Sequence, residues 1–432
     1  MTGTTQDDYT DRYARRVRGM TTSEIRALFA VANRPEVVSL AGGSPYIAAL
    51  PLDAVGDMLG QLASEHGTTS LQYGIGQGTI DLRERICEVM SLSGIGGASP
   101  DDVVVTVGGQ QALDLIARLF LDPGDVVLAE GPTYVGALGV FQAAQAQVQH
   151  VGMDAQGLIP ASLEEAIAAS DGRAKFLYTI PTYQNPAGVT LTESRREEVL
   201  DICERARLLV VEDDPYGMLS FEGDAPLPLR ARRRDGVFYV STFSKTFAPG
   251  LRVGWILAPH AVREKLVMAS EASILCPSAF AQGAVTQYLA TMPWREQIKV
   301  YREIYRERRD ALLSALSDLM PAGTTWTHPS GGLFVWATLP SGLDSKAMMP
   351  RAIAARVAYV PGTGFYADGT GGRNMRLNFS FSSPERLREG VRRLAGVMEQ
   401  EIAMRAVFGS SAVGPQRRRG PAAADAPGPD LA

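Results

Sequence analysis

The sequence predicts an α/β protein in which a mostly parallel central sheet is covered by helices on both faces, followed by a smaller α+β domain. Three observations lead to this fold class. Short runs rich in Val, Ile and Leu alternate with helical segments between residues 103 and 259. These runs are apolar throughout, which is typical of strands buried on both faces. From about residue 300 the pattern changes to a long amphipathic helix, further strands and a closing helix.

Six segments have the composition of central strands. They are VVVTVGG (103–109), DVVLAEGPTY (125–134), KFLYTIP (175–181), LLVVEDD (208–214), VFYVSTFS (237–244) and VGWILAP (253–259). Helical spacing of apolar residues predicts helices over 112–122, 163–170 and 194–207. Active sites of such sheets lie beyond the carboxyl ends of the strands. The residues directly after each strand are therefore the candidates for function.

The later elements predict the smaller domain. They are a helix over 301–320, strands within 331–340, 355–362 and 375–382, and a helix over 384–403. The domain boundaries that we expect are a flexible arm over 1–20, a segment of the small domain over 21–48, the large domain over 49–300, the small domain over 301–408 and a disordered tail over 409–432. The tail is predicted from its Pro, Gly and Ala content.

Composition excludes several classes of protein. The net charge is −5, so no basic excess is present to neutralise nucleic-acid phosphates. The three cysteines, Cys87, Cys203 and Cys276, are far apart and cannot form a disulfide framework, which favours a reducing cytoplasm. No spacing of His or Cys typical of a metal site is present, and no apolar run is long enough for a membrane helix. The start of the chain has no apolar core of a secretory signal.

One of the five lysines stands at a strand end. Lys245 lies in VFYVSTFSKTFAPGLRVGW (237–255), after a β-branched strand and among Thr242, Ser244 and Arg252. A lysine amine can form a Schiff base with an aldehyde cofactor, and hydroxyls with an arginine can hold a phosphate. A solvated surface loop is the ordinary alternative, but the other four lysines lack such neighbours.

Other strand ends carry complementary groups. In VVVTVGGQQALDL (103–115) a strand, two glycines and a helix start could bind an anion, with Gly109 and Gln110 in the lining. Asp213 ends an apolar strand, and a protonated pyridine nitrogen would be a suitable partner for its carboxylate. Asn185 could donate to a phenolate oxygen, and Tyr134 could stack on a flat ring. Each also has a plain structural interpretation as a turn, cap or core residue.

Together these segments resemble the fold type I, pyridoxal 5′-phosphate (PLP) dependent class I/II aminotransferases. The resemblance covers about residues 20–405 and is strongest to the α-aminoadipate and kynurenine aminotransferase subgroup. It rests on six motifs in the family's order. They are SEIRALFAVANRPEVVSLAGGSP, VTVGGQQALDL, PTYQNPAG, EDDPYG, STFSKTFAPGLRVGW and MRLNFS.

The resemblance implies a role for each matching residue. Lys245 is similar to the Schiff-base lysine and Asp213 to the carboxylate that keeps the pyridine nitrogen protonated. Asn185 and Tyr216 match the pair on the phenolic oxygen, and Tyr134 matches the stacking aromatic. The remaining cofactor-binding residues implied are Thr242, Ser244 and Arg252 with Gly109 and Gln110 around the phosphate, and Tyr73, which in the family reaches the neighbouring subunit's phosphate and so implies a homodimer.

The residues that match the family's substrate-binding positions depart from its pattern more than the cofactor-binding residues do. Arg376, in MRLNFS, is similar to the clamp on the substrate α-carboxylate, and Asn185 and Gly43 lie near the substrate in the family. The segment AGGSPY (41–46) departs from the AGGLP of many relatives, so Ser44 and Tyr46 leave the identity of the substrate open. Arg26 matches an arginine that can meet a distal substrate group, or it is a solvated helix arginine. The family often has Ser where this chain has Gly109.

The resemblance therefore implies an aminotransferase that works by a ping-pong mechanism through a Lys245 Schiff base. Its substrates are expected to be an aromatic, long aliphatic or 2-aminoadipate-like amino acid and a 2-oxo acid. An elimination, cyclisation or oxidation reaction on the same scaffold is an alternative that the sequence hardly separates. A PLP-binding transcriptional regulator is a remote alternative, because only about 20 residues precede SEIRAL and the chain is acidic.

Overall fold

The structure is a computed structural model that describes Tyr9, residues 12–18 and residues 34–409. A seven-stranded sheet forms its larger part, in the strand order β2-β10-β9-β8-β7-β3-β4. The strands are β2 (Val103–Thr106), β3 (Val126–Glu130), β4 (Gln147–Val151), β7 (Ala174–Thr179), β8 (Leu209–Asp213), β9 (Val237–Thr242) and β10 (Gly254–Leu257). The five strands from β9 to β4 pair in parallel, whereas β10 runs antiparallel to β2 and β9. The predicted fold class is confirmed.

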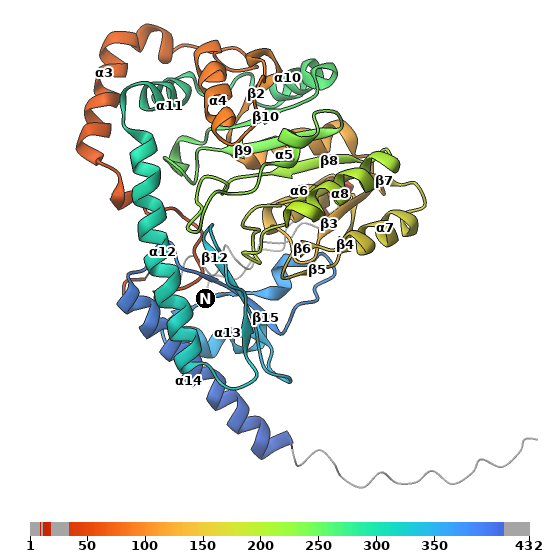
Figure 1. Ribbon diagram of the computed structural model, residues 1–432, viewed down its shortest axis with the longest axis vertical. Coiled ribbons are helices and arrows are strands. Elements are labelled where there is room, and N and C mark those ends of the chain that lie inside the picture. Colours follow the sequence, from red (N-terminus) through yellow and green to blue (C-terminus); the bar gives the residue numbers. More distant parts are fainter. Residues whose placement is uncertain (1–8, 10–11, 19–33, 410–432) are drawn as a thin grey trace, which may run out of the picture.

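Helices lie on both faces of this sheet (Figure 1). They are α4 (Ile80–Leu92), α5 (Gly108–Phe120), α6 (Val135–Ala143), α7 (Pro160–Ala169), α8 (Glu193–Arg205), α9 (Leu229–Arg232) and α10 (His260–Ile274). Two more helices, α3 (Leu52–Ser70) and α11 (Ala279–Thr291), pack against each other, and α11 also packs against α4. Strand β8 shows why the chain folds this way, because four of its five residues are buried between the two layers of helices. Helix α5 begins at Gly108, ahead of the expected start at 112, because Gly108 takes a φ of +73° that turns the chain directly from β2 into the helix.

A smaller antiparallel sheet lies below the large one in Figure 1. Its strands are β11 (Thr325–Trp326), β12 (Phe334–Thr338), β15 (Asn374–Asn378) and β14 (Val360–Pro361), and α13 (Ser345–Ala354) and α14 (Pro384–Gly409) accompany it. Near the start of the described chain, β1 (Val38–Ser39) pairs in parallel with β13 (Val357–Ala358). Residues 34–48 therefore run beside the small sheet and reach the space between the two sheets.

The helix α12 (Trp294–Leu319) passes along both parts of the molecule and lies beside α14 (Figure 1). It starts at Trp294, before the expected boundary at 301, and Tyr301 and Tyr305 on it are fully buried. The other short elements are α1 (Arg15–Arg18), β5 (Met153–Asp154), β6 (Gly157–Leu158) and the 3-10 helices η2 (Ile47–Ala49), η3 (Pro100–Asp102), η4 (Pro249–Leu251) and η5 (Gly362–Phe365).

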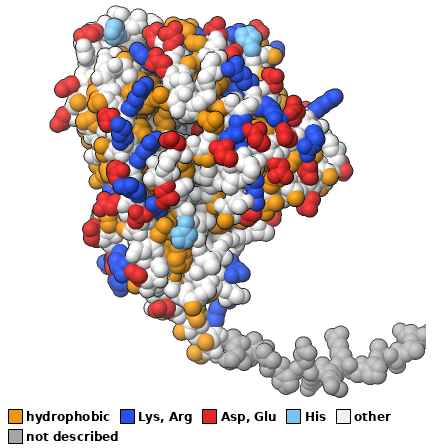
Figure 2. Space-filling view, in the orientation of Figure 1, with side chains coloured by type: hydrophobic (Ala, Val, Ile, Leu, Met, Phe, Trp, Pro, Cys, Tyr) orange, Lys and Arg blue, Asp and Glu red, His pale blue; other side chains and the backbone are white. Residues whose placement is uncertain are grey.

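Acidic and basic side chains are interspersed on the face shown in Figure 2. Within the described ranges, no helix is long and apolar enough to cross a membrane. In the same residues, no group of three or more His, Cys, Asp or Glu side chains is placed to hold a metal ion.

Candidate active site

A cavity of about 330 Å³ lies where the carboxyl ends of the large-sheet strands face the small sheet. Its volume is within the range of small-molecule sites. Residues that follow β2, β3, β7, β8 and β9 supply one side, and the segment after β1 together with β12 and β15 supplies the other. The lining consists of Gly43, Ser44, Gly109, Gln110, Tyr134, Val135, Ile180, Asn185, Asp213, Pro215, Tyr216, Thr242, Ser244, Lys245, Pro249, Arg252, Phe334 and Arg376.

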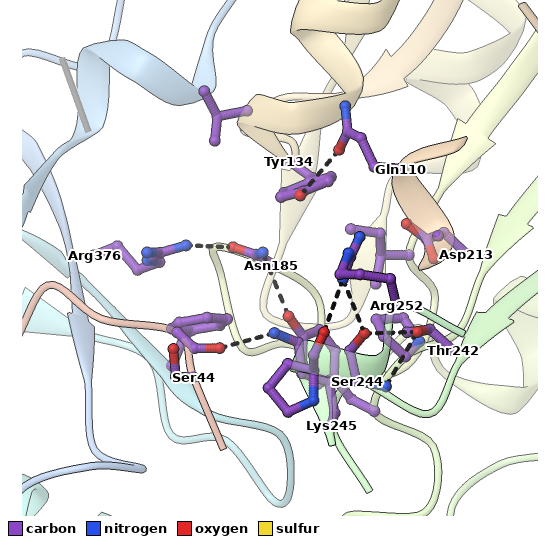
Figure 3. A pocket seen from close by; sticks show the side chains of 18 residues that line it. Ser44, Gln110, Tyr134, Asn185, Asp213, Thr242, Ser244, Lys245, Arg252 and Arg376 are labelled. Atoms are coloured by element: carbon purple, nitrogen blue, oxygen red, sulfur yellow. Dashed lines mark hydrogen bonds between the residues drawn. The ribbon is translucent and has the colours of Figure 1, made fainter. Parts of the chain in front are cut away.

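Lys245 projects into this cavity from the loop after β9 (Figure 3). Its Nζ donates to the backbone carbonyl of Gly43 at 2.8 Å, and no carboxylate lies within ion-pair distance among the described residues. Burial lowers the pKa of Lys245 to about 8, and the positive charges of Arg376 and Arg252 add to this effect. A much larger fraction of this amine is therefore neutral near pH 7 than of an exposed lysine.

One end of the cavity gathers groups that bind anions. The hydroxyl of Thr242 lies 2.8 Å from that of Ser244, and Arg252 Nη1 lies 3.4 Å from Ser244 Oγ (Figure 3). The first turn of α5, with Gly109 and Gln110 in the lining, points its free backbone N–H groups toward the same end. A Cβ atom at Gly109 would meet nothing within 4 Å, so a side chain would fit at this position without steric conflict.

A carboxylate and a phenol ring mark the wall formed by the sheet. Asp213 ends β8, and its Oδ2 accepts a hydrogen bond from Tyr178 at 2.8 Å. Burial raises the pKa of Asp213 to about 7, while the bond from Tyr178 and the charge of Lys245 act in the opposite direction. Tyr134 lies above the cavity, and its hydroxyl donates to Gln110 Oε1 at 3.2 Å (Figure 3).

The opposite end holds a buried arginine without an acidic partner. Arg376 Nη1 donates to Asn185 Oδ1 at 3.0 Å and Nη2 donates to the carbonyl of Ala41 at 3.0 Å, but its buried Nε has no hydrogen-bond partner. The guanidinium lies 4.1 Å from the centre of the Phe334 ring. Burial lowers the pKa of Arg376 to about 10. An unpaired buried cation of this kind is suited to binding a carboxylate.

Between these ends, Asn185 Nδ2 lies 3.5 Å from Tyr216 Oη. The amide thus connects the loop after β7 both to Arg376 and to the Tyr216 phenol. Close packing explains one glycine here, because a Cβ atom at Gly43 would come within 3.1 Å of the Phe334 ring. Residues 41–43 can therefore approach the cavity this closely only because Gly43 has no side chain.

The structure brings together most of the residues predicted from sequence, including every cofactor-binding residue except Tyr73. Tyr73 is 78% exposed and outside the lining. Tyr46, expected near the substrate, also lies outside the lining, because its ring packs 3.9 Å from the Arg308 guanidinium and its backbone N–H donates to Tyr305. Arg26 lies outside the described residues.

Sequence analysis did not predict several residues at the site, among them Val135 and Ile180 in the lining, the aromatic Phe334 and, behind the lining, Tyr178. Phe334 was noticed only as one aromatic of a strand, although its position after two glycines indicated a close approach of the backbone to another element. Tyr178 was overlooked because it lies inside a strand rather than after one; a hydroxyl within an otherwise apolar, fully buried run was the available indication.

A family model described as "Aminotransferase class I and II" matches residues 36–394. The chain belongs to the class I and II aminotransferases. Aromatic-amino-acid aminotransferase 1 of Thermococcus litoralis is 40% identical over 400 residues, covering 91% of this chain and 96% of that protein. The 2-aminoadipate transaminase of Thermus thermophilus is 35% identical over 387 residues, covering 88% of this chain and 95% of that protein.

Among solved structures, the kynurenine aminotransferase of Pyrococcus horikoshii, crystallised with PMP, has 39% sequence identity and a TM-score of 0.87. The match covers 92% of this chain and 99% of that chain. The aminotransferase described here is accordingly a PLP-dependent enzyme. Its cavity fits that cofactor, because a lone amine, a buried carboxylate and an anion-binding end are separate features of one lining.

The pH dependence of cofactor uptake follows from the environment of Lys245. Only the neutral amine attacks an aldehyde, and the lowered pKa of about 8 makes it available well below the ordinary lysine value of about 10.4. We expect the rate of covalent PLP capture by the cofactor-free aminotransferase to rise with pH, with a midpoint near pH 8, and to level off only at about pH 9 to 10. Stopped-flow absorbance measures this rate. A midpoint near pH 10, as for free lysine, would contradict the expectation.

Proposed function

We propose that this aminotransferase takes the amino group from aromatic α-amino acids and passes it to a 2-oxo acid. The observation that carries the proposal is the charge of the described lining. Its only cations are Lys245, Arg252 and Arg376, and each has a role that does not involve the substrate side chain. The aromatic and aliphatic side chains beside them, such as Phe334 and Val135, suit an apolar side chain. The relatives named for aromatic amino acids and kynurenine support the same class.

We assign a role in cofactor binding to the residues at the anion-binding end of the cavity and along its wall. Thr242, Ser244, Arg252 and the first turn of α5 would hold the cofactor phosphate, and Asp213 would face the protonated pyridine nitrogen. Tyr134 would cover one face of the ring. Asn185 and Tyr216 would donate to the phenolic oxygen. When bound, PLP supplies an electron sink for the electrons released as the Cα–H bond of the amino acid breaks.

The protein's own contribution is positioning and proton transfer. Arg376 binds the substrate α-carboxylate through two parallel hydrogen bonds and so fixes the direction of the Cα–H bond. The neutral form of Lys245 Nζ, which the lowered pKa of about 8 makes more abundant than in an exposed lysine, accepts the Cα proton and later gives a proton back during the same half-reaction. Phe334, packed on Arg376, excludes water from the guanidinium and strengthens its attraction for the carboxylate.

The donor class can be tested by comparing substrates and one variant. We expect kcat/KM for phenylalanine, tyrosine or kynurenine, with 2-oxoglutarate as acceptor, to exceed that for 2-aminoadipate by at least about tenfold, since no described cation meets a distal carboxylate. Formation of the 2-oxo acid product is measured by mass spectrometry. A preference for 2-aminoadipate that disappears in R26A would assign the distal group to Arg26 and overturn the proposal.

We also propose that the enzyme is a homodimer with shared active sites. Leu71, Tyr73 and Ile75 are exposed apolar residues of one loop, and Leu275 is exposed on the neighbouring loop. The two loops touch, because a Cβ atom at Gly74 would lie 3.7 Å from the carbonyl oxygen of Pro277. Several exposed apolar side chains on two adjoining loops are typical of a protein interface. Tyr73 would then reach the phosphate held by the partner subunit.

The dimer predicts a specific effect of Y73A. Sedimentation should give twice the mass of one chain for the wild-type enzyme, and Y73A should weaken PLP binding by about tenfold through loss of one hydrogen bond to the phosphate. F381A, which removes another exposed aromatic that lies far along the chain from Tyr73, is the control and should bind PLP normally. A monomer, or a Y73A enzyme with unchanged PLP affinity, would refute the shared site.

We place the enzyme in the cytoplasm. The proposal is supported by Cys87, Cys203 and Cys276, none of which is paired. Burial also raises the pKa of Cys203 to about 12 and that of Cys87 to about 11, so neither is a reactive thiolate.

A further inference from the structure

Two consecutive aspartates at the end of β8 each accept a hydrogen bond from a buried tyrosine. Tyr178 donates to Asp213 Oδ2 at 2.8 Å, and Tyr239 donates to Asp214 Oδ2 at 2.9 Å. All four side chains are buried. The aspartates differ in where they face. Asp213 lines the cavity, whereas Asp214 lies outside that lining and accepts from the backbone N–H of Gly217.

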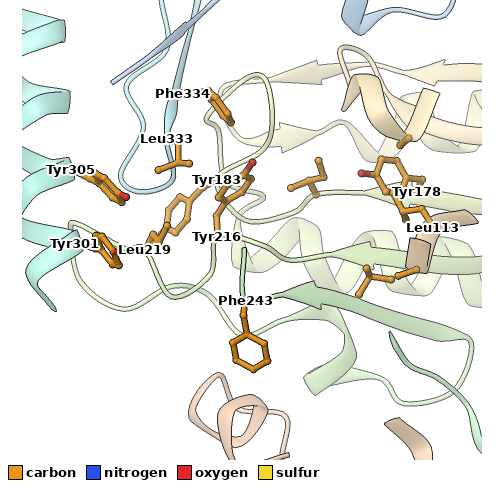
Figure 4. Close-up of a cluster of buried hydrophobic side chains, with 14 of the residues drawn as sticks. Leu113, Tyr178, Tyr183, Tyr216, Leu219, Phe243, Tyr301, Tyr305, Leu333 and Phe334 are labelled. Atoms are coloured by element: carbon orange, nitrogen blue, oxygen red, sulfur yellow. The ribbon is translucent and has the colours of Figure 1, made fainter. Parts of the chain in front are cut away.

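Tyr178 is fixed in place by its surroundings. It lies on β7, which pairs in parallel with β8, and its ring meets the Phe141 ring edge-to-face at 5.5 Å. Figure 4 shows it within the buried apolar cluster, close to Leu113. Burial and the neighbouring Asp213 raise the pKa of Tyr178 far above its ordinary value. The phenol therefore keeps its proton and acts as a donor to the carboxylate.

The bond matters because other forces act against the charge of Asp213. Removal from water and the nearby Asp214 both favour the neutral acid, while the donated hydrogen bond favours the anion. If the carboxylate held a proton more tightly, it would compete for the proton that the ring nitrogen needs. The ring works as an electron sink best when that proton stays on nitrogen.

We propose that Tyr178 is a positioning residue that keeps Asp213 ionised and orients it, so that the proton shared between Asp213 and the pyridine nitrogen remains on the nitrogen. The inference rests on the role proposed above for Asp213. Only one proton is involved: without Tyr178 it moves from the ring nitrogen to a carboxylate oxygen, and the pair changes from two ions to two neutral groups.

The test is ¹⁵N NMR of the holoenzyme reconstituted with PLP labelled at the ring nitrogen. In Y178F we expect the resonance to move toward that of an unprotonated pyridine, and kcat to fall about tenfold or more, with KM little changed, because a hydrogen bond to a charged group is lost. Y239F is the matched control. It removes an equally buried tyrosine–carboxylate bond from the neighbouring aspartate, and its ¹⁵N resonance should match the wild type.

A third variant separates this inference from the role of Asp213. If D213N leaves the resonance unchanged, the proposed role of Asp213 is wrong. If D213N moves it and Y178F does not, Tyr178 has only a structural role and the inference fails. An equal shift in Y239F would show general loosening and would also overturn it.

If Y178F does not fold, a second variant still tests the role of the Tyr178 hydroxyl. Replacing Tyr178 by 3-fluorotyrosine keeps the ring and makes the hydroxyl a stronger donor. We then expect the ¹⁵N resonance to move in the opposite direction, toward the fully protonated pyridine. No movement, or movement in the same direction as in Y178F, would contradict the proposed role.

Discussion

Replacing Lys245 with alanine is expected to abolish transamination, with kcat reduced by about 10⁴-fold or more. Lys245 is the only lysine in the described lining of the cavity. In the mechanism that we propose, its amine has two functions that no neighbour could perform, because it would attack the aldehyde of the cofactor and then carry the Cα proton. The groups around the phosphate are untouched, so PLP should still bind non-covalently. Steady-state kinetics and the absorbance spectrum measure the two effects separately.

The control for this prediction is K265A, which removes an exposed lysine of α10 and should leave activity unchanged. Borohydride reduction followed by mass spectrometry should place the cofactor on Lys245 in the wild-type enzyme and in K265A. In K245A, a small added amine should restore part of the proton transfer. Residual activity above about one hundredth of the wild-type value would mean that another base abstracts the proton.

The sequence could predict this site because most of it follows from one topological rule. Lys245 and Asn185 lie after parallel strands of the large sheet, and Asp213 is the last residue of one. The carboxyl ends of parallel strands lie at the same edge of a sheet, independently of the length and conformation of the loops. The chemical types of these residues then restricted the cofactor. The antiparallel direction of β10 could not be predicted, since a short apolar strand has the same composition in both directions.

Features that depend on packing between the two sheets could not be predicted in the same way. The position of Phe334 over Arg376 depends on how the small sheet approaches the large one. The family resemblance of the AGGSPY segment predicts Tyr46 near the substrate, but its ring contacts the Arg308 guanidinium on α12 and lies outside the lining of the cavity. The bond from Tyr178 to Asp213 joins residues 35 positions apart, on two strands whose pairing is known only once the sheet is formed.

The second large effect that we expect is a rise of KM when lysine replaces Arg376. Its side chain is buried, its hydrogen bonds go only to neutral oxygens of Asn185, Ala41 and Gly42, and its Nε has no partner. Keeping such a charge out of water is costly, and in the mechanism that we propose the substrate carboxylate would offset this cost. We expect R376K to raise KM for both the amino acid and the 2-oxo acid by about 10²–10³-fold, because lysine keeps the charge but loses the two parallel hydrogen bonds.

The comparison with R373K decides whether this effect belongs to carboxylate binding. Arg373 lies just before β15 and donates to the backbone carbonyl of Leu339, so the same substitution there changes the same strand without touching the cavity. R373K should keep wild-type kinetics, and R376K should keep the wild-type cofactor spectrum. An equal rise of KM in both variants would point to a distorted strand. An unchanged KM in R376K would mean that the substrate carboxylate binds elsewhere, and the direction that we derive for the Cα–H bond would fail with it.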